Sequence, residues 1–141
     1  GELVRAAAHY RQAIGTMRAF AEAWGNLGIT YEAMGEPQEA LLAMDMARLH
    51  NARLPRLGRN IAALKVRVAE HGRAVQEYRR ALEEEPGSPD LLYGLAYALY
   101  HTRRYEEAAR SAEQALAGRS DFPDARELLA RARERVAAPV D

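Results

Sequence analysis

The apolar residues of this chain recur with the period of α-helices. Within residues 21–54, four of them lie at positions i, i+3, i+4 and i+7, namely Trp24, Leu27, Gly28 and Tyr31. This spacing places all four on one face of a helix. A second helical face follows, formed by Ala40, Met44 and Ala47. Gly35 and Pro37 lie between the two faces, where glycine can end one helix and proline can begin the next. The pattern predicts two antiparallel helices joined by a short turn.

The same arrangement returns every 34 residues. One position holds the small residues Ala6, Ala40, Ala74 and Ala108, and another holds Ala13, Ala47, Ala81 and Ala115. A third position holds Gly28, Ala62, Ala96 and Ala130, each preceded by a large apolar residue, Leu27, Ile61, Leu95 or Leu129. Small side chains at fixed sites let two helices approach closely, while large neighbours fill the surrounding space. Because one helix pair cannot bury its apolar face alone, we expect neighbouring pairs to stack.

These residues resemble the tetratricopeptide repeat, whose pattern is Trp-x2-Leu-Gly-x2-Tyr, then Ala-x3-Phe and a late Pro. Residues 21–54 match it closely, although Met44 replaces the aromatic residue of the second helix. Residues 55–88 depart from it with Gly58 and Lys65, which stand where the family has Trp and Tyr. The resemblance implies an all-α fold, a right-handed superhelical solenoid of antiparallel helix pairs with about eight helices.

The repeat register divides the chain, taken as one domain of residues 1–141, into successive segments. These are a second helix of a partial repeat (1–20), three repeats (21–54, 55–88 and 89–122), a capping helix (123–136) and a tail (137–141). In the capping helix we expect four inward residues, Leu128, Leu129, Ala132 and Val136. The first helix lacks a partner of its own, so we expect a fragment of a longer protein or docking of that helix elsewhere. Its surface would then offer Val4, Ala7, Ala8 and Ile14.

Composition narrows the function classes. The 20 basic and 20 acidic residues cancel, which argues against a general nucleic-acid binder or a membrane-surface protein. The chain has no cysteine, which excludes disulfides, thiolate nucleophiles and cysteine-ligated metal centres. No apolar run approaches the ~18 residues of a membrane span. We therefore expect neither nucleic acid nor membrane insertion.

Catalytic motifs are missing from the sequence. The single lysine, Lys65, is not part of a phosphate-binding loop, and no serine lies in a nucleophile elbow. The acidic runs 83–85 and 106–107 are consecutive on helices, so their carboxylates point about 100° apart and do not converge. The four histidines, which we expect to be solvated, have no His-x3-His spacing and are His9, His50, His71 and His101. We expect no enzyme activity, catalytic residue, metal or cofactor.

The resemblance also implies that the first helices of successive repeats line a concave face that binds extended or helical peptides. Residues opposite the packing positions would form this face. They are Glu22, Gly25, Asn26, Ile29, Arg56, Arg59, Asn60, Ala63, Asp90, Tyr93, Gly94, Tyr97, Tyr100, His101, Glu127 and Arg131. Of these we select eight as candidate partner-binding residues: Asn26, Arg56, Arg59, Asn60, Tyr93, Tyr97, Tyr100 and His101.

Three features carry this selection. Asn26 and Asn60 share one repeat position, and a carboxamide offers both a donor and an acceptor to a peptide backbone. The tyrosines at 93, 97 and 100 form one stripe, and the arginines at 56, 59 and 67 give the central repeat a positive excess. Tyrosine and arginine are enriched at interface hot spots. Each feature has a structural alternative: asparagines bonded within the scaffold, tyrosines in the core, and ordinary surface arginines.

The leading hypothesis is a non-catalytic adaptor that binds a protein or peptide, with an acidic group near the middle of the groove. One alternative is the substrate-recruiting region of a larger enzyme, and another is a homo-oligomer assembled through the N-terminal helix. A helical-repeat RNA reader conflicts with the neutral charge balance. Binding of chaperone C-termini is rejected, because only Asn60 matches the residues that such family members use, whereas Gly25, Ile29, Asp90 and Gly94 do not.

Overall fold

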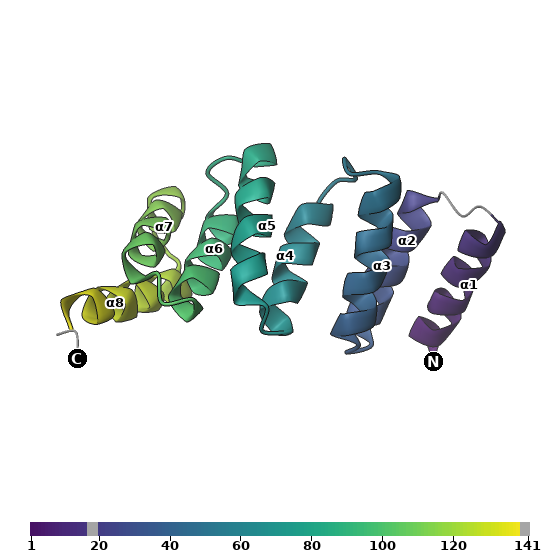
Figure 1. Cartoon of the computed structure of the whole chain (residues 1–141), viewed down its shortest axis with the longest axis horizontal. Coiled ribbons are helices and arrows are strands. Elements are labelled where there is room, and N and C mark those ends of the chain that lie inside the picture. Colours follow the sequence, from purple (N-terminus) through teal and green to yellow (C-terminus); the bar gives the residue numbers. More distant parts are fainter. Residues whose placement is uncertain (17–19, 139–141) are drawn as a thin grey trace. The chain divides into compact units, whose positions relative to one another are not determined.

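The computed structural model describes residues 1–16 and 20–138, and all regular structure in these residues is α-helical (Figure 1). The eight helices are α1 (Glu2–Thr16), α2 (Ala21–Ala33), α3 (Pro37–His50), α4 (Leu57–Arg67), α5 (His71–Glu84), α6 (Pro89–His101), α7 (Tyr105–Gly118) and α8 (Pro123–Ala137). The predicted all-α class is confirmed.

The helices form two compact units. The first unit spans Gly1–Ala69 and contains α1 to α4, whereas the second spans Glu70–Asp141 and contains α5 to α8. The division falls inside the predicted repeat 55–88, so its two helices belong to different units. The predicted repeat boundaries stay a prediction. Residues 17–19 of the predicted first segment and 139–141 of the predicted tail lie outside the described residues.

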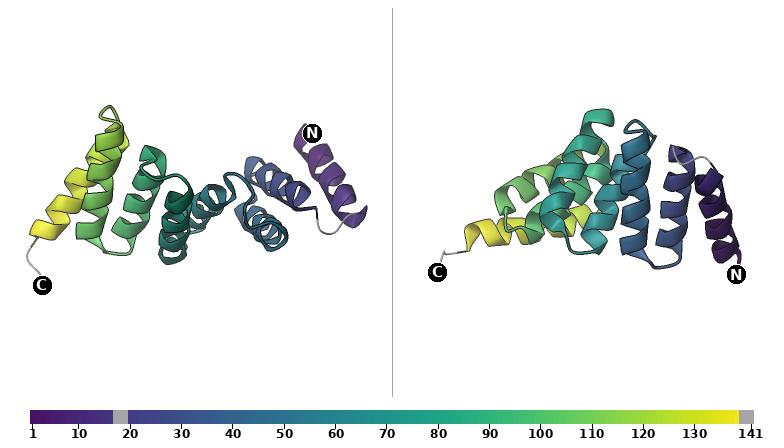
Figure 2. Two further views of the ribbon diagram at one scale, coloured as in Figure 1. Left: turned by 90° about the horizontal axis from the view of Figure 1, so that it is seen from above. Right: turned by 45° about the vertical axis from the view of Figure 1, so that its right-hand side comes forward.

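The first unit is built around the pair α2 and α3, which lie side by side in both views of Figure 2. Its core contains Leu27 from α2, Met44 from α3 and Ile61 from α4, all nearly or fully buried. A Cβ added at Gly28 would lie 2.6 Å from Met44 Cγ and 3.1 Å from the Ala40 carbonyl oxygen. The predicted close approach of these two helices at small residues is therefore confirmed.

Helix α1 presents less apolar surface than predicted. Ala7 and Ile14, expected to be available for docking, are buried in the core of the first unit. That expectation was wrong because α1 packs against α2 through this face. Leu3 and Val4 remain exposed near the start of the helix, at 42% and 58% of their surface.

In the second unit, α8 closes the end of the described helices. Leu128, Leu129 and Ala132 are buried as predicted, but Val136 is 46% exposed and Ala130 is also exposed. Both of these expectations were wrong. At the position of Ala130, Gly28 faces the second helix of its own repeat, and no described helix follows α8 to play that part.

The turns that join first and second helices share a left-handed residue. Gly35, Ala69 and Arg103 lie 34 residues apart and have φ angles of 79°, 60° and 62°. After α2, the Glu36 N–H donates to the Tyr31 carbonyl at 2.9 Å, and after α6 the Arg104 N–H donates to the Leu99 carbonyl at 2.9 Å. These bonds satisfy carbonyls at the helix ends, as left-handed C-terminal caps do. Only one of the three turns has the glycine that this conformation favours.

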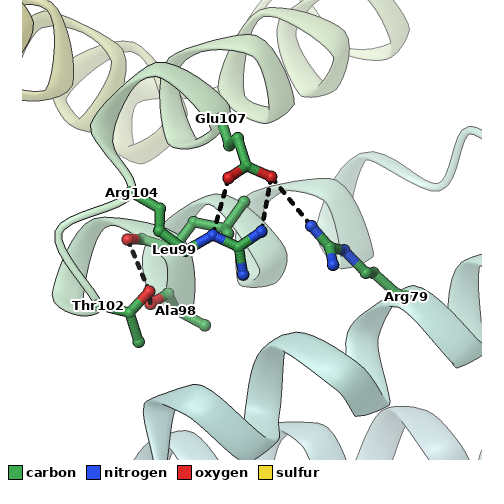
Figure 3. A network of polar contacts seen from close by, with 6 residues as sticks. All are labelled: Arg79, Ala98, Leu99, Thr102, Arg104 and Glu107. Atoms are coloured by element: carbon green, nitrogen blue, oxygen red, sulfur yellow. Dashed lines mark hydrogen bonds and ion pairs between the residues drawn. The ribbon is translucent and has the colours of Figure 1, made fainter.

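A polar network supports the α6–α7 turn (Figure 3). The Glu107 carboxylate on α7 accepts two hydrogen bonds from Arg104, at 2.7 and 2.8 Å, and one from Arg79 of α5 at 3.0 Å. Thr102 Oγ1 donates to the carbonyls at the end of α6. The hydrogen bond from Arg104 is the main reason that the pKa of Glu107 lies below its ordinary value, and the charges of Arg104, Arg79 and Arg110 lower it further. One carboxylate thus ties α5 to α7 across the turn.

Candidate functional site

The first unit has a hollow of about 160 Å³ beside α2. The buried side chains Met44 and Leu57 form its floor, and exposed residues of α2 form part of its rim. The lining residues are Glu22, Gly25, Asn26, Ile29, Met44, Leu54, Pro55, Leu57 and Asn60. All four residues that the sequence placed on the α2 side of the concave face therefore line one hollow.

Asn26 from α2 and Asn60 from α4 both line this hollow. No hydrogen bond joins either carboxamide to another of the described residues, although Thr30 Oγ1 donates to the Asn26 backbone carbonyl at 2.8 Å. Asn26 is exposed and Asn60 is half-buried. In the described part of the chain, the alternative in which these amides serve only the scaffold thus has no supporting contact. Both amides are placed to donate and accept at the same surface.

The three arginines of the predicted positive excess have different environments. Arg56 is exposed at the start of α4, with a left-handed backbone at φ 62°. Arg59 is half-buried, and its Nε atom is inaccessible to water. Arg67 donates to Glu32 of α2 at 3.0 Å, so it links two helices of the first unit. None of the three lines the hollow, and Arg56 is the one with an exposed side chain and no described ion pair.

The second unit has a smaller hollow, of about 100 Å³, between α6 and α8. Tyr93 and Tyr97 of α6 line it, with ring centroids 6.4 Å apart and ring planes 53° apart. Its other lining residues come from α8 and are Asp124, Glu127, Leu128 and Arg131. Two aromatic faces and two carboxylates therefore share one recess.

The predicted tyrosine stripe separates at its third member. Tyr100 does not line the hollow; its ring packs edge-on against Tyr105 at 5.3 Å, under the Arg131 guanidinium at the same distance. Tyr93 also contacts Phe122 at 5.0 Å and adjoins the core of the second unit. The core alternative thus describes Tyr100 and part of Tyr93, whereas the half-buried Tyr97 lies at the recess.

His101 forms a cluster that the sequence did not predict. Its ring stacks on His71 of α5 with centroids 4.7 Å apart and contacts Tyr97 at 4.4 Å. Burial is the main cause that lowers the pKa of His101, and the positive charges of His71 and Arg131 add to it. The expectation of a solvated His71 was wrong: the residue is half-buried and its Nδ1 is out of contact with water. Thirty residues separate the two histidines, so no local spacing indicated the pair.

Gly94 and Asp124 exchange the roles expected from the sequence. Gly94 was placed on the concave face, but it is buried against the ring of Tyr78 from α5. Asp124 was not predicted and lines the second hollow. A signal for it was present, because Glu22, Arg56, Asp90 and Asp124 occupy one position at intervals of 34 residues.

Two other kinds of site were searched in the described residues. Within 1–16 and 20–138, no three His, Asp or Glu side chains gather in a way that could hold a metal ion. None of the helices in those ranges is both long and apolar enough to cross a membrane. Binding chemistry in this part of the chain is therefore carried by amides, aromatic rings and charged side chains.

Comparisons with known proteins agree with this architecture. Family models described as tetratricopeptide repeat match residues 69–132 and 21–47. No curated protein matches the chain. Among solved structures, MamA is 18% identical with a TM-score of 0.91, covering 96% of this chain and 74% of its own.

Two further structures share the fold. YrrB, described as a TPR protein with an unusual peptide-binding site, is 19% identical with a TM-score of 0.89, covering 94% of this chain and 69% of its own. The first TPR of Spaghetti (RPAP3), bound to the HSP90 peptide SRMEEVD, is 19% identical with a TM-score of 0.77, covering 84% and 94%. At these identities the likeness establishes the fold.

Proposed function

Because the chain belongs to the tetratricopeptide repeat family, we propose that it is a non-catalytic interaction scaffold that binds an extended peptide segment of a partner protein. The observation that carries this proposal is the hollow of the first unit, where Asn26 and Asn60 present open carboxamides beside an apolar floor. YrrB and the RPAP3 repeat are described as peptide-binding proteins with the same fold, which supports a peptide as the class of ligand.

The hollow fits the chemistry of an extended backbone. Each residue of such a segment presents an N–H donor and a C=O acceptor, and one carboxamide can pair with both. The floor of Met44 and Leu57, with the exposed Ile29 at the edge, accepts one apolar side chain of the segment. The exposed Arg56 at the start of α4 favours an acidic group in the partner. Recognition of this kind reads backbone shape first and side chains second.

The experiment uses the intact chain as bait for a phage-displayed library of random peptides. The most enriched peptide is synthesised with a fluorescent label, and its dissociation constant is measured by anisotropy for the wild type and for Asn26→Ala and Asn60→Ala. We expect each variant to weaken binding about three- to tenfold, the usual effect of lost hydrogen bonds. Gln38→Ala is the matched control, because it removes an exposed carboxamide from α3, outside the hollow.

Two results would contradict the proposal. One is a selection that enriches no peptide above background on the folded chain. The other is a set of peptides whose affinity is the same for wild type, both asparagine variants and Gln38→Ala. Circular dichroism of each variant confirms that the helices are intact.

A further inference from the structure

The recess between α6 and α8 has an unbalanced charge. Asp124 and Glu127 contribute two carboxylates, and Arg131 contributes the single positive charge among the lining residues. The nearest approach of Arg131 to Glu127 is 3.9 Å, a long ion pair, and the Arg131 guanidinium lies over the Tyr100 ring instead. No ion pair or hydrogen bond joins Asp124 to another residue of the described ranges. The recess therefore retains net negative charge.

The aromatic side of the recess responds to that charge. Burial raises the pKa of the Tyr93 phenol above its ordinary value, and the negative charge of Asp124 raises it further, followed by Tyr97 and Glu127. The carboxylates of α8 thus act on the side chains of α6 across the recess. Both walls then favour positive charge, because aromatic ring faces attract cations and carboxylates accept charge-assisted hydrogen bonds.

The size and shape of the recess restrict what can enter it. At about 100 Å³ it is smaller than the hollow of the first unit, and it suits one side-chain end group. The rings of Tyr93 and Tyr97 are tilted by 53°, so they form two sides of an angle with the carboxylates opposite. A flat guanidinium or a compact ammonium meets a ring face and a carboxylate at once in this arrangement.

We propose that the recess between α6 and α8 binds the cationic end of an arginine or lysine side chain carried by the partner. This inference rests on the proposed function, since the partner segment supplies the side chain. It assigns a basic residue to the portion of the partner that reaches the second unit.

The test uses small probes, so that it does not depend on finding the partner. The isotopically labelled chain is titrated with N-acetylarginine amide, N-acetyllysine amide and the neutral isostere N-acetylcitrulline amide, while backbone NMR shifts are recorded. We expect saturable shifts in α6 and α8 around the recess with at least one cationic probe, and at least about fivefold weaker binding of citrulline. Equal effects of the citrulline probe, or no saturable shift with either cation, would overturn the proposal.

Variants then separate the contributions. Asp124→Asn and Glu127→Gln are each expected to weaken binding of the cationic probe about threefold. Glu134→Gln is the control, because Glu134 is an exposed carboxylate of α8 outside the recess. Arg131→Gln is expected to strengthen binding by removing the competing charge. Weaker binding in Arg131→Gln would make the recess an anion site and refute the inference.

The same variants distinguish this inference from the proposed function. The cationic amide does not engage the hollow of the first unit, so Asn26→Ala and Asn60→Ala are expected to leave its affinity unchanged. If the recess binds no cation while selected peptides still depend on the asparagines, only the further inference fails. If the recess binds arginine but no peptide depends on the asparagines, the proposed peptide groove fails.

Discussion

Gly94 of α6 lies directly against the phenol ring of Tyr78 of α5. A Cβ built on Gly94 would lie 2.7 Å from the Tyr78 hydroxyl oxygen and closer still to two ring carbons. Tyr78 is itself buried, so its ring has little space into which to move. Glycine at this position is therefore required by the packing of the second unit, and not by a turn.

Gly94→Ala is expected to lower the stability of the chain by roughly 1–2 kcal/mol. The strain of overpacking exceeds the gain of about 1 kcal/mol that alanine brings to a helix interior. Gly25→Ala is the matched control in α2, because the atoms nearest to a Cβ at Gly25 lie 3.9 and 4.0 Å away, an ordinary contact distance. Thermal melts of the two variants are expected to shift in opposite directions. A stabilised Gly94→Ala would show that the Tyr78 ring moves freely.

Arg103→Gly is expected to stabilise the α6–α7 turn by about 0.5–1 kcal/mol. Arg103 has a φ of 62°, a conformation that costs a residue with a Cβ and suits glycine. Its side chain is exposed, so little contact is lost. The reverse change, Gly35→Ala, places a Cβ in the same conformation after α2 and is expected to destabilise by about 1 kcal/mol. Urea unfolding midpoints measure both effects, and destabilisation by Arg103→Gly would contradict the reasoning.

Glu107→Gln is expected to lower the melting temperature by about 1–3 °C at pH 7. The pKa of Glu107 lies below its ordinary value of 4.5, so the folded state favours its carboxylate more than the unfolded state does. That stabilisation is present above the ordinary pKa and is lost as the pH falls through the lowered pKa. The melting temperatures of wild type and variant should thus converge in acid. Glu106→Gln, next to it in the first turn of α7, is the control for the helix dipole.

Arg59→Ala and Asn60→Ala are expected to differ in stability although the residues are neighbours. Asn60 has no hydrogen bond from its amide to the described residues, so its replacement should change the free energy of unfolding by less than about 0.5 kcal/mol. Arg59 is half-buried with an inaccessible Nε, so truncation removes packing of its stem and is expected to cost about 1 kcal/mol. Chemical unfolding of the two single variants measures this difference. Equal stabilities would return Arg59 to the exposed surface.

The helices and their close contacts could be predicted because they depend on periodic positions. Gly28, Ala40 and Ala74 recur at fixed intervals, and all three are fully or almost fully buried. Ala130 continues the interval but is exposed, because burial requires a neighbouring helix as well as a repeat position. Periodicity therefore predicts which face of a helix is apolar, and the neighbour decides whether that face is covered.

The candidate sites were predicted less completely. Asn26 and Asn60 could be paired from one repeat position, and the hollow of the first unit contains both. The stacking of His71 on His101 and the position of Asp124 opposite Tyr93 depend on contacts between different helices. Tyr97 and Tyr100 lie on one helix, yet only Tyr97 lines the recess, since Tyr105 and Arg131 engage Tyr100.

The turns at Gly35, Ala69 and Arg103 keep one backbone shape with three different side chains. Evolution can thus exchange the residue at such a corner freely, trading a modest loss of robustness for a new surface group. A directed library confined to these three codons would alter durability while leaving both recognition surfaces untouched.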